Sequence, residues 1–289
     1  MKNRSQGRRN PRANEMAAKT VIWTAAIFVI AVLVFVVAYI LVKGLPVLSW
    51  AFITEIPRNM GRSGGVSSTI IGTLLITAVA VVLAAPFGIG TAFYLAEYTR
   101  ESNITRIIRF CAESLAGIPS IVYGLFGFIF FVIYLDIGWS VLSGGLTLAF
   151  MILPTVIRTS EEAIRAVPPI YREVSFSLSA TKWQTIYKVV FPSAIRGIVN
   201  GLILGVGRSI AETAAVILTA GSALRMPTSL FSPTRTMAVH FYILAREGIS
   251  MENALGTAAL LIILIFIINV GANVLVNRFI ERTHHARKK

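Results

Sequence analysis

The fold is decided by residues 171–220, which read YREVSFSLSATKWQTIYKVVFPSAIRGIVNGLILGVGRSIAETAAVILTA. The first half is polar and amphipathic. The second half, from Gly197 to Ala220, is long and apolar enough to cross a membrane, which takes about 20 residues. Only Arg208 and Glu212 carry charge within it. The stretch therefore predicts a surface segment joined directly to a membrane-spanning helix.

The first half carries the signals of two short helices joined by a turn. Prolines at 168–169 suit the start of a helix that runs to about Leu178. Thr181 is the expected N-cap of a second helix, with a glutamine in capping-box spacing. This second helix carries Trp183 and is expected to stop before Pro192. Such a hairpin fits a partner's groove or a lipid surface, and the pattern leaves both open.

The composition is that of a membrane protein. Of 289 residues, 55% are hydrophobic and 14% are charged, against about 25% charged in soluble domains. The net charge of +14 does not indicate nucleic acid, because the basic residues flank apolar segments instead of forming a patch with stacking aromatic residues. A single cysteine, Cys111, excludes an intrachain disulfide. The sequence has no nucleotide-binding P-loop and no metal-ligand spacing, so we expect no metal, no cofactor and no ATP hydrolysis in this chain. His240 is expected to be solvated or interfacial.

Apolar segments predict an all-α polytopic membrane protein with six transmembrane helices. They are residues 21–42, 69–95, 114–135, the part of 137–157 that follows a turn at Gly144–Gly145, 197–220 and 253–277. Of 27 Lys and Arg residues, 20 lie in the two tails and in the loops 97–113 and 158–196. The positive-inside rule therefore puts both termini and these loops in the cytoplasm. Residues 1–19 of the N-terminal tail have little apolar surface to bury and are expected to be disordered.

Several short motifs carry a resemblance to a known family. They are Glu173-Val174-Ser175, Ser179-Ala180-Thr181, Val189–Pro192, Gly207–Thr213, Val156–Thr159 and Ala96–Tyr98. The first three resemble the "EAA" loop of ABC-importer permeases, and the fourth is similar to the "GRxxGET" signature of phosphate-importer permeases. The last two fit the PstA-type subunit better than its PstC-type partner. Ser179 stands where the loop usually has a glycine, which would take φ > 0 at little cost.

The resemblance implies a type I ABC-importer permease fold in the inner or plasma membrane. It divides the chain into a tail (1–20), a first span with its outer loop (21–65), a permease domain (66–277) and a second tail (278–289). The coupling loop, 158–196, would dock on the ATPase through Glu173, Ser179, Ala180, Thr181, Trp183 and Pro192. The implied partners are a PstC-type permease, an ATPase dimer that binds ATP and Mg, an extracytoplasmic phosphate-binding protein and inorganic phosphate.

Arg208 and Glu212 are four residues apart, so one helix face would carry both and bring them within reach of each other. An arginine facing lipid would cost about 2.5–3.5 kcal/mol, so the two are expected to face the protein interior or a solute path. They form either a structural ion pair or a gate for an anion. Arg158 would draw the anion toward the inner mouth, or would serve only as a positive-side anchor. A guanidinium fork suits sulfate, molybdate or phosphonate as well as phosphate.

The predicted fifth span also has a stripe of small residues at four-residue spacing. It consists of Gly197, Gly201, Gly205, Ser209 and Thr213. Small residues allow close helix packing, either with a second permease subunit or within this chain. A stand-alone secondary transporter is the alternative from another class, and it would show repeats with broken helices. The sequence predicts neither feature. A membrane scaffold that only binds is the third possibility.

Overall fold

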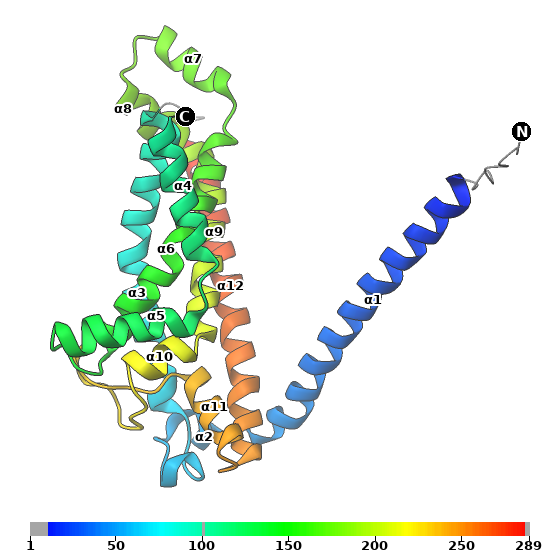
Figure 1. The fold of residues 1–289 in the computed structure, drawn as a ribbon, viewed down its shortest axis with the longest axis vertical. Helices are drawn as coiled ribbons and strands as arrows, with labels where there is room; N and C mark the ends of the chain where they lie inside the picture. Colours follow the sequence, from blue (N-terminus) through cyan, green and yellow to red (C-terminus); the bar gives the residue numbers. More distant parts are fainter. Residues whose placement is uncertain (1–10, 100–101, 287–289) are drawn as a thin grey trace, which may run out of the picture.

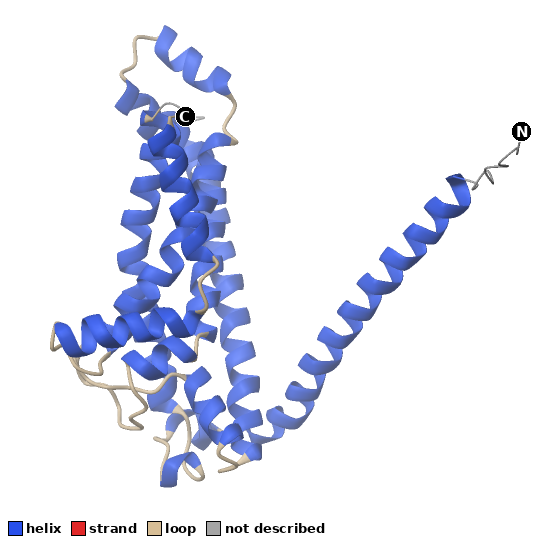
Figure 2. Cartoon of the chain, viewed as in Figure 1, coloured by secondary structure: helices blue, strands red, loops and turns tan. Residues whose placement is uncertain are grey.

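The computed structural model describes residues 11–99 and 102–286, and within them the chain is made of helices and loops without a strand (Figures 1 and 2). The α-helices are α1 (Pro11–Gly44), α2 (Trp50–Thr54), α3 (Ser67–Phe93), α4 (Asn103–Ala116), α5 (Ser120–Gly127), α6 (Val141–Arg165), α7 (Pro169–Ser177), α8 (Lys182–Thr185), α9 (Phe191–Ala211), α10 (Ala214–Thr219), α11 (Met237–Arg246) and α12 (Met251–Ala286). Short 3₁₀ segments are η1 (Leu45–Val47) and η2 (Asn59–Gly61), and π-helical segments are η3 (Tyr94–Tyr98), η4 (Phe128–Tyr134) and η5 (Ile186–Val190).

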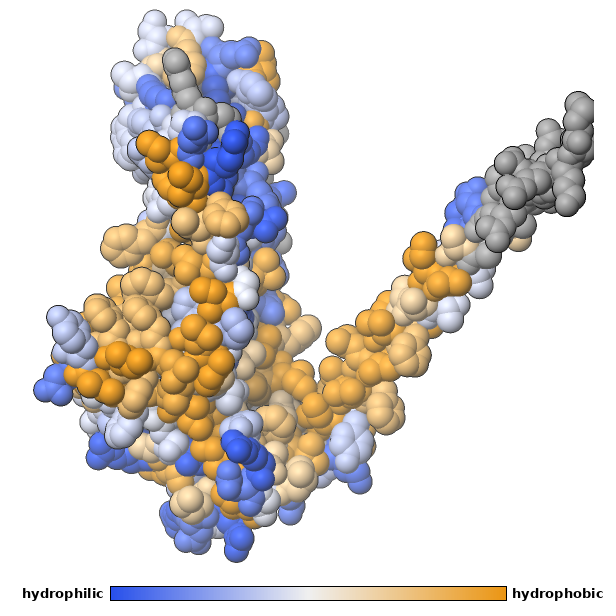
Figure 3. Space-filling model, viewed as in Figure 1, coloured by the Kyte–Doolittle hydropathy of each residue, from blue (hydrophilic) through white to orange (hydrophobic). Residues whose placement is uncertain are grey.

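Five helices are long and apolar enough to cross a membrane, and a sixth span results if α4 and α5–η4 count as one bent span. Figure 3 shows hydrophobic residues over the middle of the bundle and along most of α1, with hydrophilic residues gathered at the two ends. An apolar belt between polar ends is what a bilayer requires. The chain is therefore a multi-pass membrane protein, and the predicted count of six agrees with this arrangement.

The core of the bundle lies between α3, α6 and α10. Its fully buried side chains include Ile76 of α3 and Leu148 and Ile152 of α6. Gly144 and Gly145 lie inside α6 rather than in a turn, so the predicted turn is wrong. A side chain at either position would collide with Ala220 or Val79, respectively. These glycines therefore permit close helix contact, and α6 begins earlier, at its N-cap Ser140.

The third predicted span, 114–135, is not one straight helix. Helix α4 and the segment α5–η4 meet at an angle of 98°. The bend falls at Gly117–Pro119, where the proline has no N–H to donate and restricts the residue before it. Most of the predicted charged loop, 97–113, is the amphipathic helix α4.

Helix α1 diverges from the bundle (Figure 1) and is exposed along most of its length. It meets α12 near Gly44, where a side chain would collide with Leu255 and Ala259. Residues 11–19 belong to this helix, so the prediction of a disordered tail is wrong for them; residues 1–10 lie outside the described part. At the other terminus α12 extends to Ala286, into the predicted second tail.

The sequence predicted a solvated or interfacial His240. In the structure His240 of α11 is buried, so the solvated alternative is wrong. Its Nδ1 lies 3.3 Å from Nη1 of Arg235, which is also buried and donates from Nε to the carbonyl oxygen of Ser222. Burial, together with the charge of Arg235, lowers the pKa of His240 to about 4. The imidazole is therefore neutral near pH 7, and it fixes Arg235 within the end of the bundle that carries α2 and α11.

Candidate functional site

The predicted fifth span is broken beside its charged residues. Helix α9 ends at Ala211, and Glu212 has extended backbone angles (φ −74°, ψ 132°) before α10 begins at Ala214. Oε1 of Glu212 accepts hydrogen bonds from the N–H groups of Thr213 (3.1 Å), Ala214 (3.1 Å) and Ala215 (3.4 Å). The carboxylate thus satisfies donors that a helix start leaves free, and it suits the positive end of the α10 dipole.

Arg208 and Glu212 consequently do not form the predicted pair. The helix ends between them, and no described residue in 11–99 or 102–286 forms an ion pair or hydrogen bond with Arg208. Arg208 is exposed in the last turn of α9, where a cation is favoured by the helix dipole. Beside it, Gly207 faces open space. The guanidinium donors are therefore available to a ligand without a carboxylate competing for them.

The small-residue stripe packs against α6 of the same chain. A side chain at Gly197 would collide with Ala163, and one at Gly201 with Thr159. Gly205 faces Ile152 and Val156, and Ser209 is buried. For the three glycines the intrachain interpretation holds and the seam with a second subunit does not; Ser209 is buried within this chain. Close packing fixes α9 on α6, which leaves the exposed Arg208 next to a rigid seam.

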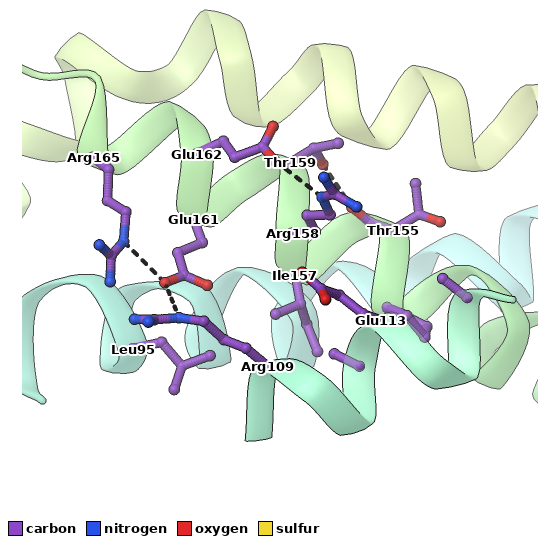
Figure 4. A pocket seen from close by; sticks show the side chains of 13 residues that line it. Leu95, Arg109, Glu113, Thr155, Ile157, Arg158, Thr159, Glu161, Glu162 and Arg165 are labelled. Atoms are coloured by element: carbon purple, nitrogen blue, oxygen red, sulfur yellow. Dashed lines mark hydrogen bonds and ion pairs between the residues drawn. The ribbon is translucent and has the colours of Figure 1, made fainter. Parts of the chain in front are cut away.

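A pocket of about 420 Å³ lies between α4 and α6 (Figure 4). Its charged lining residues are Arg109, Glu113, Arg158, Glu161, Glu162 and Arg165. The buried carboxylate of Glu161 accepts from Nε of Arg109 and of Arg165, both at 2.9 Å. The pocket holds equal numbers of arginines and glutamates, so its charge alone does not select an anion.

Arg158 lies in this pocket, where neither Arg208 nor Glu212 lines the wall. Its Nε donates to Glu162 at 3.0 Å, and both side chains are about two-thirds exposed (64% and 65%). Exposed pairs of this kind contribute about 0–1 kcal/mol, so an incoming anion could displace Glu162 at small cost. The three predicted path residues therefore occupy two separate places.

The predicted hairpin is confirmed in α7, α8 and the turn between them, which lie at one end of the molecule (Figure 1). Thr181 caps α8, and the reciprocal contact from Gln184 completes the capping box. The predicted stop before Pro192 is wrong, because α8 continues through η5 into α9. Pro192 is the second residue of α9 and follows the π-helical segment η5 closely, so the irregular turn falls beside the residue that has no N–H to donate.

The hairpin exposes an unusual amount of apolar and aromatic surface. Its exposed members are Ile170, Tyr171, Val174, Phe176, Leu178 and Trp183, and Tyr187 of the adjoining η5 is exposed as well. The rings of Trp183 and Tyr187 stack with centroids 6.5 Å apart. Glu173 of α7 is also exposed. The Ser175 and Thr185 hydroxyl groups form a buried hydrogen bond (2.8 Å) between the two halves of the hairpin. A buried hydrogen bond thus holds the two halves of the hairpin together, and its outer surface is largely apolar, as a docking surface requires.

Ser179 adopts the glycine conformation that its position in the turn requires, with φ +58°. A left-handed conformation costs a residue other than glycine roughly 1–2 kcal/mol. We therefore expect Ser179→Gly to raise the free energy of unfolding by about 0.5–1 kcal/mol, measured by thermal unfolding in detergent. The control is Ser177→Gly at the end of α7, which should lower stability, since glycine is a poor helix former. Loss of stability in Ser179→Gly would contradict the strain.

The sequence did not predict the ion pair between Glu97 and Arg172. These side chains come from η3 and α7, 75 residues apart, and meet at 2.7 Å. The motif Ala96–Tyr98 contains Glu97, but it did not indicate that Glu97 would pair with Arg172.

Comparisons with known proteins agree with this architecture. Residues 85–285 match the family model described as "Binding-protein-dependent transport system inner membrane component". The chain is 32% identical over 279 residues to the "Probable ABC transporter permease protein YqgI" of Bacillus subtilis, covering 91% of this chain and 95% of that one. It is 31% identical over 238 residues to the "Phosphate transport system permease protein PstA" of Xylella fastidiosa, covering 82% and 83%.

Solved structures support the fold alone, because their sequence identity to this chain is low. A bacterial alginate importer chain superposes with a TM-score of 0.63 at 14% identity, covering 92% of this chain and 96% of that one. A chain of the MetNI methionine transporter gives a TM-score of 0.60 at 19% identity, covering 72% and 93%. The predicted permease fold is thereby confirmed, and the chain belongs to the family of binding-protein-dependent transport system inner membrane components, alongside the PstA permeases that it resembles.

Proposed function

We propose that this chain is the PstA-type subunit of an ATP-driven importer of inorganic phosphate. Relatives in Xylella fastidiosa and Mycobacterium tuberculosis carry the name of phosphate permease. The observation that carries the proposal is Arg208, an exposed guanidinium that makes no hydrogen bond or ion pair with the described residues, at a helix break within an apolar span. An arginine at membrane depth is expensive unless it serves a path, and its forked donors match a tetrahedral oxyanion.

Arg208 would contact phosphate in the path, and Arg158 would hold it at the inner mouth. Glu212 would fix the break that presents Arg208. Conduction requires that the anion can leave its site as well as enter it. Because no carboxylate competes for Arg208, the binding of the anion must be weakened in another way. Movement of α9 against the partner permease supplies such a change. This is the alternating access on which importers rely.

The chain requires other subunits to do this work. A PstC-type permease would complete the path, two ATPase copies would bind ATP and Mg and hydrolyse the nucleotide, and an extracytoplasmic binding protein would deliver phosphate. The exposed apolar hairpin is the surface that would receive the ATPase, since α7 and α8 extend beyond the apolar belt. No cofactor is assigned to this chain itself.

Reconstitution of the full complex in proteoliposomes tests the proposal. ATP-dependent uptake of labelled phosphate, not displaced by excess sulfate or molybdate, is the expected result. Uptake of sulfate or molybdate in preference would identify another oxyanion permease. Secondary transporters use discontinuous membrane helices, and this chain has a break between α9 and α10 and a bend between α4 and α5. The experiment therefore also tests the alternative of a stand-alone secondary transporter. Phosphate flux by this chain alone, without ATPase or ATP, would establish that alternative.

The proposed orientation places α7, α8 and both termini in the cytoplasm. In a Cys111→Ala background, Ser229→Cys should react with an impermeant thiol reagent in intact cells. Ser177→Cys should react only after permeabilisation. Ser229 and Ser177 are both exposed, so accessibility differs by side of the membrane and not by burial. Labelling of Ser177→Cys in intact cells would overturn the orientation.

A further inference from the structure

Arg172 of α7 ties three elements together at the base of the hairpin. Its Nη2 and Nε donate to Oε1 of Glu97 at 2.7 and 2.9 Å. Its Nη1 donates to the carbonyl oxygen of Val167 at 2.7 Å, and Nη2 also reaches that of Ile164 at 2.9 Å. One guanidinium thus joins α7 to η3, to the last turn of α6 and to the connection between α6 and α7.

The contact is protected from solvent. The side chains of Arg172 and Glu97 are 20% and 9% exposed. Charge-assisted hydrogen bonds are shorter and stronger than neutral ones, and water at this depth competes weakly for them. The carbonyl oxygen of Ile164 belongs to the last turn of α6 and that of Val167 follows the C-cap Ala166, so the guanidinium lies at the helix C-terminus, where a cation is also favoured by the helix dipole.

A second contact joins the hairpin to the same short segment. Nζ of Lys182, the first residue of α8, lies 4.8 Å from the centre of the Tyr98 ring. Residues 97 and 98 of η3 therefore hold α7 and α8, respectively. Segment η3 continues α3 without a gap, and α3 supplies Ile76, Ala80 and Ala84 to the buried core shared with α6.

Stability alone does not account for this arrangement. A buried ion pair is weak evidence for stability, since well-packed apolar residues often replace one without loss. The pair instead provides hydrogen bonds of fixed geometry between the exposed hairpin and η3, the segment that continues core helix α3. A π-helical segment is also frequent at functional places in helices.

We infer that Glu97 and Arg172 are positioning residues that transmit movement of the hairpin to α3, and Lys182 with Tyr98 supports them. The inference rests on the proposed coupling of the hairpin to an ATPase. When the ATPases move the hairpin, the Glu97–Arg172 link pulls on the end of α3, and the core shared with α6 moves with it. Without the link, movement of the hairpin would still reach α9 through η5, but it would not be passed directly to the end of α3.

The test measures phosphate uptake and ATP hydrolysis together, in proteoliposomes that hold the full complex with its binding protein. Glu97→Gln keeps the shape of the side chain and removes its charge. We expect the complex to stay assembled and to hydrolyse ATP near the wild-type rate, while phosphate moved per ATP falls by about fivefold or more. A merely structural role would lower both activities together with thermal stability and leave their ratio unchanged.

Two further variants keep the inference falsifiable. Glu15→Gln removes an exposed pair with Lys19 in α1 and should leave the ratio unchanged. Lys182→Gln removes the contact with Tyr98 without exposing the core, and should lower the ratio in the same direction as Glu97→Gln by about twofold. A wild-type ratio in an assembled Glu97→Gln complex overturns the inference. Should that variant fail to assemble, a wild-type ratio in Lys182→Gln overturns it. Wild-type complex that hydrolyses ATP without moving phosphate would instead refute the proposed function.

Discussion

Replacement of Arg208 by glutamine is expected to abolish phosphate uptake while the subunit still folds and binds its ATPase. Arg208 is exposed, and no described residue depends on it for a hydrogen bond or ion pair, so its loss leaves no buried partner unsatisfied. A hydrogen bond to a charged group contributes about 1.5–3 kcal/mol. Loss of two such bonds to the anion would lower uptake by about 100-fold or more.

Arg208→Lys should retain little uptake, because an ammonium group keeps the charge but lacks the planar fork. The matched control is Arg225→Gln, which removes an exposed arginine from the loop before α11. Uptake into proteoliposomes gives the activity, and co-purification of the ATPase shows that assembly persists. Near-normal uptake in Arg208→Gln would remove Arg208 from the path.

A charge swap between positions 208 and 212 would not separate a gate from a structural pair. Glu212 accepts hydrogen bonds from the start of α10, and an arginine there would meet backbone N–H groups and the positive end of a helix dipole. The swap should therefore fail whatever Glu212 does in transport. Glu212→Gln is the better comparison, because the amide oxygen can still accept these bonds while the charge is gone.

Local signals in the sequence predicted the hairpin well. The Thr181 capping box and the prolines at 168–169 act within a few residues, so neighbouring side chains suffice to determine the structure. Long apolar runs likewise predicted the spans of α1, α3 and α12, because a bilayer selects length and composition. Hydropathy did not predict the additional helical turns at the ends of these helices, because it indicates only the apolar part of a helix.

Errors arose where tertiary contacts decide between readings of the same residues. Gly144 and Gly145 fit a turn or a close helix contact equally well, and only the approach of Val79 and Ala220 selects the latter.

The break at Glu212 has a local cause. It lies in a run that is apolar on both sides, and it depends on hydrogen bonds between the Glu212 side chain and nearby backbone N–H groups. Such local competition with helix hydrogen bonds has no periodic signal in the sequence.

Contacts between distant segments could not be derived from one sequence. Glu97 and Arg172 are 75 residues apart, and Arg109 and Glu161 are 52 apart. In the sequence, each of these charged residues was consistent with a solvated loop on the side of the membrane that is rich in lysine and arginine. Their partial burial depends on how α4, α6 and η3 converge, and this follows only from the packed bundle.

Substitution of Trp183 by serine is expected to release the ATPase from the complex and abolish uptake. Trp183 is 64% exposed and its ring stacks on that of Tyr187, so the two form an aromatic projection on the surface of the hairpin. Aromatic anchors that fill a partner's pocket commonly contribute 2 kcal/mol or more, so binding should weaken by about 30-fold or more. Glu173→Lys and Ala180→Asp, on the same hairpin, should have the same direction of effect.

The control is Trp50→Ser, which removes an 80% exposed tryptophan from α2 at the opposite end of the molecule. Co-purification of the ATPase should then match the wild type, which separates a hairpin effect from a general loss of exposed aromatic surface. Thermal unfolding of Trp183→Ser should also match the wild type, because most of Trp183 is exposed in the isolated subunit. If uptake disappears while the ATPase stays bound with normal turnover, the hairpin transmits movement but does not hold the ATPase, and the docking role is wrong.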